Sequence, residues 1–199
     1  GIYLFDKSGV NFSLTGSFTL QGVVPSNGGG ALDFGTVTRV TTPATDDNFI
    51  ANTGNFPGET RDIDAFAKAG TISYGDIEAD ANSDKVFMIN LFQKRLIVFN
   101  GTAATATLNG AGAAALAPFT TAYDILSLPG IPAATGAGNN IRPYAIKIYK
   151  GKGYLGVVSD AMATQNGADL RGYILQFDPN NIAAGFTTVL TINFNTWPT

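Results

Sequence analysis

The stretch ISYGDIEADANSDKVFMINLFQKRLIVFN, residues 72–100, decides the fold of this chain. It contains three short runs of strand-forming residues, separated by a polar turn at 81–84 and a second turn at 92–94. Three strands of this length with tight turns and an apolar middle strand are typical of one blade of a β-propeller. Because blades repeat, the stretch predicts an all-β fold with further copies elsewhere in the chain.

A second copy of the pattern lies at residues 143–178. Its strands are expected at 144–149, 153–159 and 171–178, and the segment Lys-Gly-Lys at 150–152 supplies its first turn. The second copy closes on YILQFD where the first closes on LIVFN. Two copies of one strand pattern strengthen the propeller interpretation.

A fragment of a third copy opens the chain, where IYLFD at residues 2–6 has the same ending and is followed by a hairpin partner at 11–20. Fourth strands are expected at 125–128 and 186–194. We therefore predict a single β-propeller-like domain, or part of one, made of a partial blade at 1–24 and full blades at 72–128 and 143–195.

The spacing between copies exceeds the roughly 40–50 residues of common blade repeats. Either insertions decorate the blades or a degenerate blade lies between them. We favour insertions, because residues 101–141 are low in charge and rich in Ala, Gly and Thr. Residues 101–122 within this range are expected to be an exposed insertion with a short helix at 113–116. A propeller needs typically about four to eight blades, so the others lie outside this chain or the fold is not a closed propeller.

The composition excludes several functional classes. Charged residues make up only 14% of the 199 residues, and the twelve Lys and Arg are scattered, so a nucleic-acid partner is not expected. No run reaches the roughly 18 apolar residues of a transmembrane segment. The chain has no Cys and no His, which removes disulfides, thiolate metal sites and the Ser-His-Asp triad.

Three carboxylates alternate along one expected strand. Asp76, Glu78 and Asp80 share a face, because successive side chains of a strand point to opposite sides. Such a row could bind a hard cation such as Ca²⁺, which prefers several oxygen ligands. The alternative is that the three acids are solvated. The Thr-Asp-Asp-Asn segment at 45–48 is a second oxygen-rich cluster, more typical of a turn than of a cation site.

Arg142 precedes the second copy much as Asp76 begins the first. The two side chains are expected to pair between blades, and a ligand site formed by them is the alternative. Asp160 ends the middle strand of the second copy, and Asp169 and Arg171 lie near the start of its third strand; the three are expected to fix the loop at 161–170. We therefore take Arg142, Asp160 and Arg171 as candidates for ligand contacts or contacts between blades.

Several motifs resemble a propeller-like segment of large secreted bacterial surface proteins, which often carry SdrD-type B repeats or Ig-like modules. The matching motifs, spread over about residues 60–178, are YGDIE, VFMINL, RPYAIK and YKGK. Those proteins typically show a G-D-[IL]-[DE] motif, a V-N-L-[YF] strand and an R-P-[FY]-A-[LIV]-K-[VI] motif before a K-G-K turn. The resemblance implies an extracellular adhesive or structural role and no catalytic residues, and this chain departs from it in a shorter loop after Asp160.

Three functions follow from these observations. The preferred one is a non-enzymatic, secreted or cell-surface module for adhesion or assembly, whose partners are other protein modules, copies of itself or surface glycans. The second is part of a propeller hydrolase or lactonase that holds a cation at Asp76. The third is a subunit of an extracellular filament or layer, with the apolar loop at 101–122 forming contacts between copies.

Overall fold

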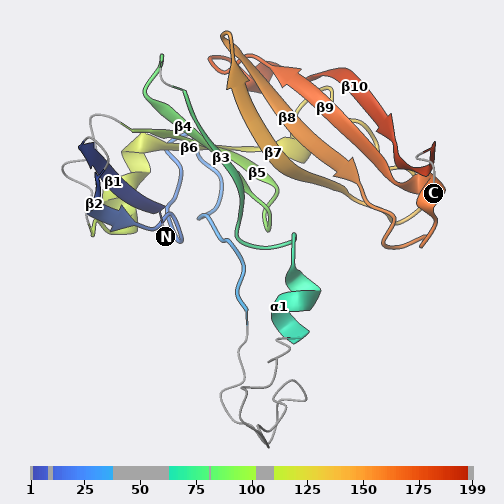
Figure 1. Cartoon of the computed structure of the whole chain (residues 1–199), viewed down its shortest axis with the longest axis horizontal. Coiled ribbons are helices and arrows are strands. Elements are labelled where there is room, and N and C mark those ends of the chain that lie inside the picture. Colours follow the sequence, from blue (N-terminus) through green and yellow to red (C-terminus); the bar gives the residue numbers. More distant parts are fainter. Residues whose placement is uncertain (1, 9–10, 38–62, 81, 102–109, 197–199) are drawn as a thin grey trace, which may run out of the picture.

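The computed structural model describes residues 2–8, 11–37, 63–80, 82–101 and 110–196. This part of the chain is mostly β-structure and contains three antiparallel sheets, none of them closed. Figure 1 shows the sheets following one another across the molecule. The all-β prediction is therefore confirmed, while the sheets by themselves do not make a propeller.

The first sheet is a hairpin of β1 (Ile2–Ser8) and β2 (Asn11–Phe18). The second, the middle sheet, has the order β3-β4-β5-β6 and is formed by the strands Tyr74–Asp80, Lys85–Asn90, Arg95–Asn100 and Thr120–Asp124. The third, the C-terminal sheet, has the order β10-β9-β8-β7, with β7 to β10 at Ile141–Tyr149, Lys152–Ser159, Arg171–Phe177 and Thr187–Asn193. Both four-stranded sheets are therefore simple meanders, as their sequence similarity predicts.

The turns follow from local sequence. Lys150 and Gly151 both have positive φ, at 49° and 73°, which is the backbone of a two-residue type I′ hairpin turn. Glycine is well suited to the second of these positions because it has no Cβ to clash there. The hairpin predicted around residues 150–152 is thus confirmed, and it fixes the register of β7 against β8.

The helices are short. Helix α1 spans Ile63–Lys68, and α2 spans Ala113–Leu116, where the sequence predicts a short helix. Helix α1 closes with an ion pair of 2.8 Å between Lys68 Nζ and Asp64 Oδ2, an i, i+4 pair. None of the helices in the described part of the chain is long and apolar enough to cross a membrane.

Two sequence predictions around the middle sheet are wrong. Its fourth strand is Thr120–Asp124, whereas Ile125–Ser127, part of the predicted strand, forms a 3₁₀ helix. The Asp124 carboxylate accepts hydrogen bonds from the N–H of Leu126 and the hydroxyl of Ser127, which turns the chain there. The region at 101–122 is also not wholly exposed, since Leu116 is fully buried; residues 102–109 lie outside the described part.

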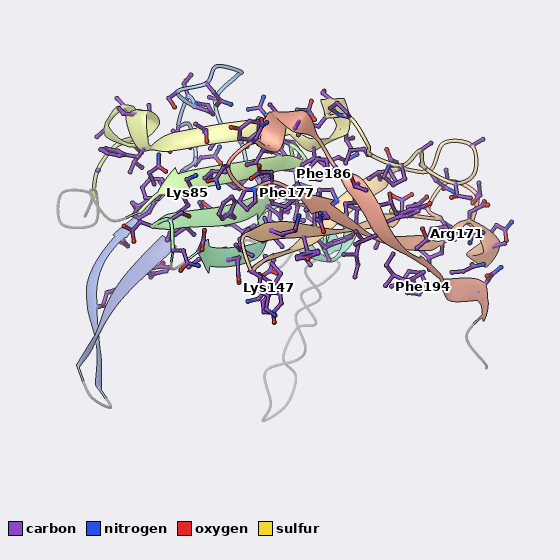
Figure 2. The ribbon with its side chains drawn as sticks, turned by 90° about the horizontal axis from the view of Figure 1, so that it is seen from above. Lys85, Lys147, Arg171, Phe177, Phe186 and Phe194 are labelled. Carbon is purple, nitrogen blue, oxygen red and sulfur yellow. The ribbon has the colours of Figure 1, made fainter. Side chains whose placement is uncertain are left out.

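The middle sheet has a hydrophobic core on each face. One core joins it to the C-terminal sheet, where Phe87 and Phe177 approach to 6.5 Å between ring centroids and Phe177 meets Phe186 edge-on. Figure 2 shows Phe177 and Phe186 at this central position. The other core joins the middle sheet to residues 16–34, and its buried members there are Phe18, Leu20, Val23, Leu32 and Phe34.

The chain is therefore a stack of three layers. We call β1, β2 and the segment up to residue 34 the N-terminal layer, which is followed by the middle sheet and the C-terminal sheet. Strands β3 and β7, the first strands of the two larger sheets, lie side by side. The middle and C-terminal sheets thus meet with their apolar faces and with their first strands.

Candidate functional site

The contact between β3 and β7 brings together the residues that the sequence singled out as a carboxylate row. Asp76 Oδ2 accepts a hydrogen bond of 3.1 Å from the backbone N–H of Ile146, and Glu78 Oε1 accepts one of 3.3 Å from the N–H of Ile148. Glu78 also forms an ion pair of 2.7 Å with Lys147 Nζ. The carboxylates of one sheet therefore satisfy the edge N–H groups of the next, which water or another strand would otherwise have to satisfy.

The third carboxylate of the row is used differently. Asp80 accepts hydrogen bonds from the backbone N–H of Asn82 and the hydroxyl of Ser83, in the turn before β4. The Ser83 hydroxyl is the main cause that lowers the pKa of Asp80 below its ordinary value, and the Asn82 N–H adds to it. The predicted metal site at Asp76, Glu78 and Asp80 gains no support, because the described residues contain no group of three acidic side chains that could hold a metal ion.

The backbones of β3 and β7 approach each other closely at this contact, at Gly75 and Tyr144. Gly75 precedes Asp76, and a Cβ placed on it would lie 2.8 Å from the carbonyl oxygen of Tyr144 and 3.0 Å from Leu91. Only glycine lets β3 approach β7 this closely. At the far end of the sheets, Lys85 Nζ donates to Asn180 Oδ1 at 3.1 Å, a second polar link between them.

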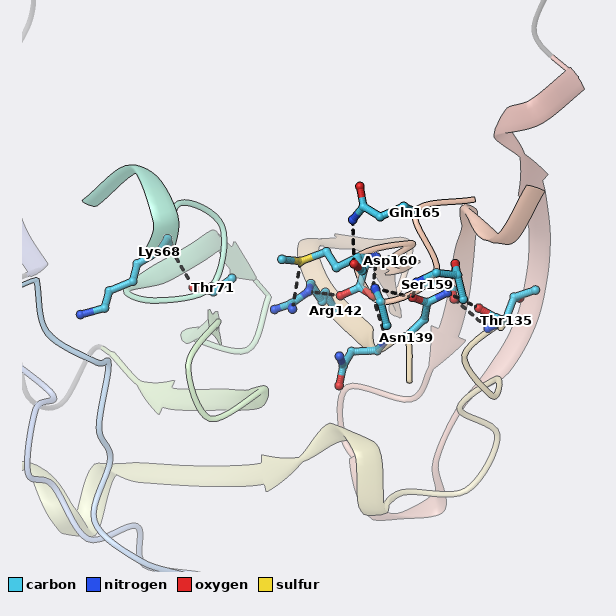
Figure 3. A network of polar contacts seen from close by, with 12 residues as sticks. Lys68, Thr71, Thr135, Asn139, Arg142, Ser159, Asp160 and Gln165 are labelled. Carbon is cyan, nitrogen blue, oxygen red and sulfur yellow. Dashed lines mark hydrogen bonds and ion pairs between the residues drawn. The ribbon is translucent and has the colours of Figure 1, made fainter. Parts of the chain in front are cut away.

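The predicted pairing of Arg142 with Asp76 is wrong. Arg142 Nε instead donates to Asp160 Oδ2, at the end of the adjacent strand of the same sheet, and its Nη2 lies 3.4 Å from Met162 Sδ. Arg142 pairs with Val158 across the β7–β8 ladder, which brings it beside Asp160 (Figure 3). Sequence spacing could not show this, because the partner is set by strand register.

Asp160 is the centre of a buried polar cluster. Burial raises the pKa of Asp160, but the N–H of Asn140 and the guanidinium of Arg142 outweigh burial, so that the pKa lies below its ordinary value. The N–H bond from Asn140 is 2.9 Å long, and the N–H of Met162 points at the same oxygen from 3.4 Å. The carboxylate thus stays ionised and is surrounded by donors, as a buried charge requires.

Asn139 completes the cluster and was not among the residues chosen from the sequence. It is 9% exposed, its amide nitrogen donates to Thr135 O and Thr164 Oγ1, and its oxygen accepts from the N–H of Ala163 and of Thr164. The buried Ser159 hydroxyl accepts from the N–H of Thr135 at 2.8 Å, as Figure 3 shows. The only signal in the sequence is the Asn-Asn pair ahead of β7.

Arg171 fixes the other side of the same loop. Its Nη1 donates to the carbonyl oxygens of Ala168 and Leu170 and to Asn193 Oδ1, the last at 2.7 Å. The prediction that Asp160 and Arg171 fix the loop at 161–170 is confirmed. The loop is therefore held at one end by Asp160 and at the other by Arg171.

A shallow cavity of about 330 Å³ opens at the opposite end of the C-terminal sheet. Its charged lining residues are Lys152 and Asp178, and the remaining lining residues are Gly151, Gln176, Phe177 and residues 184–187. It brings together no arrangement of a nucleophile and a base. The Asp-rich segment at 45–48, the second oxygen cluster in the sequence, lies outside the described residues.

No protein-family model, no curated protein and no solved structure shows a significant match to this chain.

Proposed function

We propose that this chain is a non-enzymatic structural or adhesive module, built on a β-propeller-like stack of sheets and acting outside the cell or at its surface. Its partners would be other protein modules, further copies of itself or surface glycans. The resemblance to propeller-like segments of secreted bacterial surface proteins supports the location, and the low charge and the lack of Cys and His are compatible with it.

One observation carries the proposal. The middle and C-terminal sheets share one strand order, stack by their apolar faces, and meet at their first strands through Asp76 and Glu78. This is how neighbouring blades of a propeller meet, with the first strands innermost. Asp76 and Glu78 hold this stack together, whereas Asp80 holds its own turn. Arg142, Asp160 and Arg171 hold a loop. These structural uses support a scaffold rather than a reaction centre.

The hydrolase alternative requires a cation held by carboxylates with a coordination position open to substrate. Asp76 and Glu78 are occupied by backbone N–H groups and Lys147, and Asp80 by its own turn. No observation therefore favours that alternative.

The proposal is tested with the purified chain and with cells that express this protein. Mild proteolysis of intact cells should remove the antigen, and the purified chain should bind glycan arrays or purified surface proteins. It should not hydrolyse lactone or ester substrates, with or without Ca²⁺. Hydrolysis that requires Ca²⁺, is lost in Asp76→Asn and survives in the control Asp80→Asn would establish the alternative, and an antigen that stays protected inside intact cells would contradict the location.

A further inference from the structure

The C-terminal sheet has one buried face and one face with apolar side chains that the described residues leave open. The cross-strand pairs of Tyr154 with Gln176 and of Ile174 with Leu190 lie on the face that points away from the middle sheet. Leu190 is 47% exposed and Phe194 36% exposed, and the Phe194 ring lies over Gly172 on this same face. We call this surface the trailing face, with the members Tyr154, Val158, Ile174, Leu190, Ile192 and Phe194.

The trailing face corresponds to a face that is covered elsewhere in the same molecule. Strands β4 and β8 each begin with a lysine paired to the last residue of the strand before it, so Lys85 corresponds to Lys152. In this alignment Phe87 corresponds to Tyr154 and Leu91 to Val158. Phe87 and Leu91 belong to the core that the C-terminal sheet covers. The trailing face of the C-terminal sheet is therefore the equivalent of the face of the middle sheet on which the next layer packs.

At the opposite end of the stack, the described residues leave two large apolar side chains of the β1–β2 hairpin exposed. In the β1–β2 hairpin, Tyr3 pairs with Ser17, and a register shift then pairs Phe5 with Leu14. Because Phe18 packs toward the middle sheet, this pairing places Tyr3 and Leu14 on the side that points away from it. They are 62% and 59% exposed. We call this surface the leading face.

We propose that the trailing face of one copy of this chain binds the leading face of a second copy, head to tail. Within the chain a layer's trailing side packs twice against the leading side of the next layer, once at each core. A second copy supplies the same kind of surface to the trailing face of the C-terminal sheet, which the described residues leave open. Such a contact joins unlike surfaces, so repeated addition gives a closed ring or an open filament. The inference rests on the proposed function and names its partner.

The chemistry of the trailing face fits a contact between separately folded copies. It carries Tyr154 where the internal contact has Phe87, and Gln176 where that contact has Val98. Ala145 stands opposite Gly156, at the place where Asp76 stands in the middle sheet, so the carboxylate link between layers is absent. Arg142 and Lys147 stand opposite Val158 and Tyr154 and so lie at the β7 edge of the same face, where they pair with Asp160 and Glu78. The contact between copies is therefore held mainly by apolar area and is more polar than the internal one.

The test measures self-association by sedimentation velocity and light scattering, over about 5 to 500 µM protein, a range that covers weak interfaces. The wild-type chain should form oligomers that grow with concentration. Leu190→Arg on the trailing face and Leu14→Arg on the leading face should each weaken association about tenfold or more, because an unpaired guanidinium would be buried. Leu126→Arg is the matched control, since Leu126 is 42% exposed outside both faces and should have no effect.

Mixing the two variants gives the decisive measurement. Each variant keeps one intact face, so an equimolar mixture should form a one-to-one dimer that neither variant forms alone. Circular dichroism establishes that each variant is folded, and Leu190→Ser and Tyr3→Ser replace any that is not. A wild-type chain that stays monomeric throughout, a mixture that does not associate, or a control that weakens association as much as the variants would overturn the proposal, while leaving a non-enzymatic surface module intact.

Discussion

At the scale of single residues, the ion pair of Arg142 and Asp160 shows how burial determines the role of a side chain. The two side chains are 17% and 9% exposed and belong to one polar cluster with the buried Ser159 and Asn139. A buried charge is tolerated only where hydrogen bonds surround it, and Asp160 has donors from Arg142, Asn140 and Met162. The sequence identifies both residues as candidates for a functional site. Only their hydrogen-bond partners in the folded chain show that they hold a loop in place.

We predict that Asp160→Asn lowers the free energy of unfolding by about 2–3 kcal/mol at neutral pH, since it leaves the Arg142 guanidinium half-buried without its counter-ion. The folded protein holds the pKa of Asp160 below its unfolded value, which is about 4. The ionised Asp160 carboxylate therefore makes its full contribution to the free energy of unfolding above about pH 4, and this contribution is lost as the pH falls through the folded pKa. Urea unfolding at several pH values measures it.

The difference in unfolding free energy between wild type and Asp160→Asn should shrink below about pH 4. Asp178→Asn is the control, because Asp178 is exposed and asparagine can accept the same hydrogen bond from the N–H of Asn180. It should change stability by less than about 0.5 kcal/mol. A difference for Asp160→Asn that does not vary with pH would show that its charge is not what stabilises the loop.

At the scale of elements, the contact between β3 and β7 is the feature that joins the two large sheets. Both strands lie at a sheet edge, and unpaired N–H groups at an edge need acceptors. Asp76 and Glu78 provide those acceptors, and Gly75 allows the close approach. The sequence analysis expected the alternating acids to bind a cation or to be solvated, whereas Asp76 and Glu78 accept hydrogen bonds from the backbone of β7.

We predict that the double variant Asp76→Ala, Glu78→Ala exposes the amides of Ile146 and Ile148 to exchange. Both amides lose their acceptors, which should cost about 1–3 kcal/mol for each buried N–H left unpaired. Hydrogen–deuterium exchange followed by NMR should show a larger loss of protection at these two amides than at Leu155, in the central strand β8.

Asp80→Ala is the control for this experiment, because Asp80 bonds only within its own turn among the hydrogen bonds described above. It should leave the amides of Ile146 and Ile148 as protected as in the wild type. Equal exchange in all three proteins would mean that the carboxylates do not hold the two sheets together.

At the scale of the whole molecule, the middle sheet is shared by two cores. Phe87 and Ile89 face the C-terminal sheet, whereas Met88 and Ile97 face the N-terminal layer. Each of these four side chains is completely buried. Because neither neighbouring layer can leave without exposing one face of the middle sheet, the three layers should unfold together.

We predict that Leu155→Ala in one core and Met88→Ala in the other each lower the unfolding free energy by about 3 kcal/mol. Both should shift one and the same thermal transition in differential scanning calorimetry. The exposed Leu126→Ala should shift it by less than the equivalent of about 0.5 kcal/mol. Two separate transitions, only one of them sensitive to Met88→Ala, would show that the layers are independent.

The sequence by itself determined the all-β class, two copies of one four-stranded unit and most of the strands, because alternation, turn residues and β-branched residues act locally. It placed the fourth strand of the middle sheet wrongly, since a capping aspartate at 124 competes with strand propensity there.

Only the tertiary structure decided what the polar residues do. The partners of Asp76, Arg142 and Asp160 are fixed by strand register and by the stacking of sheets, and these bring together groups up to 70 residues apart in sequence. Whether an alternating acid binds a metal, water or an edge strand depends on what stands opposite it. Local sequence carries no information about that neighbour, because long-range packing selects it.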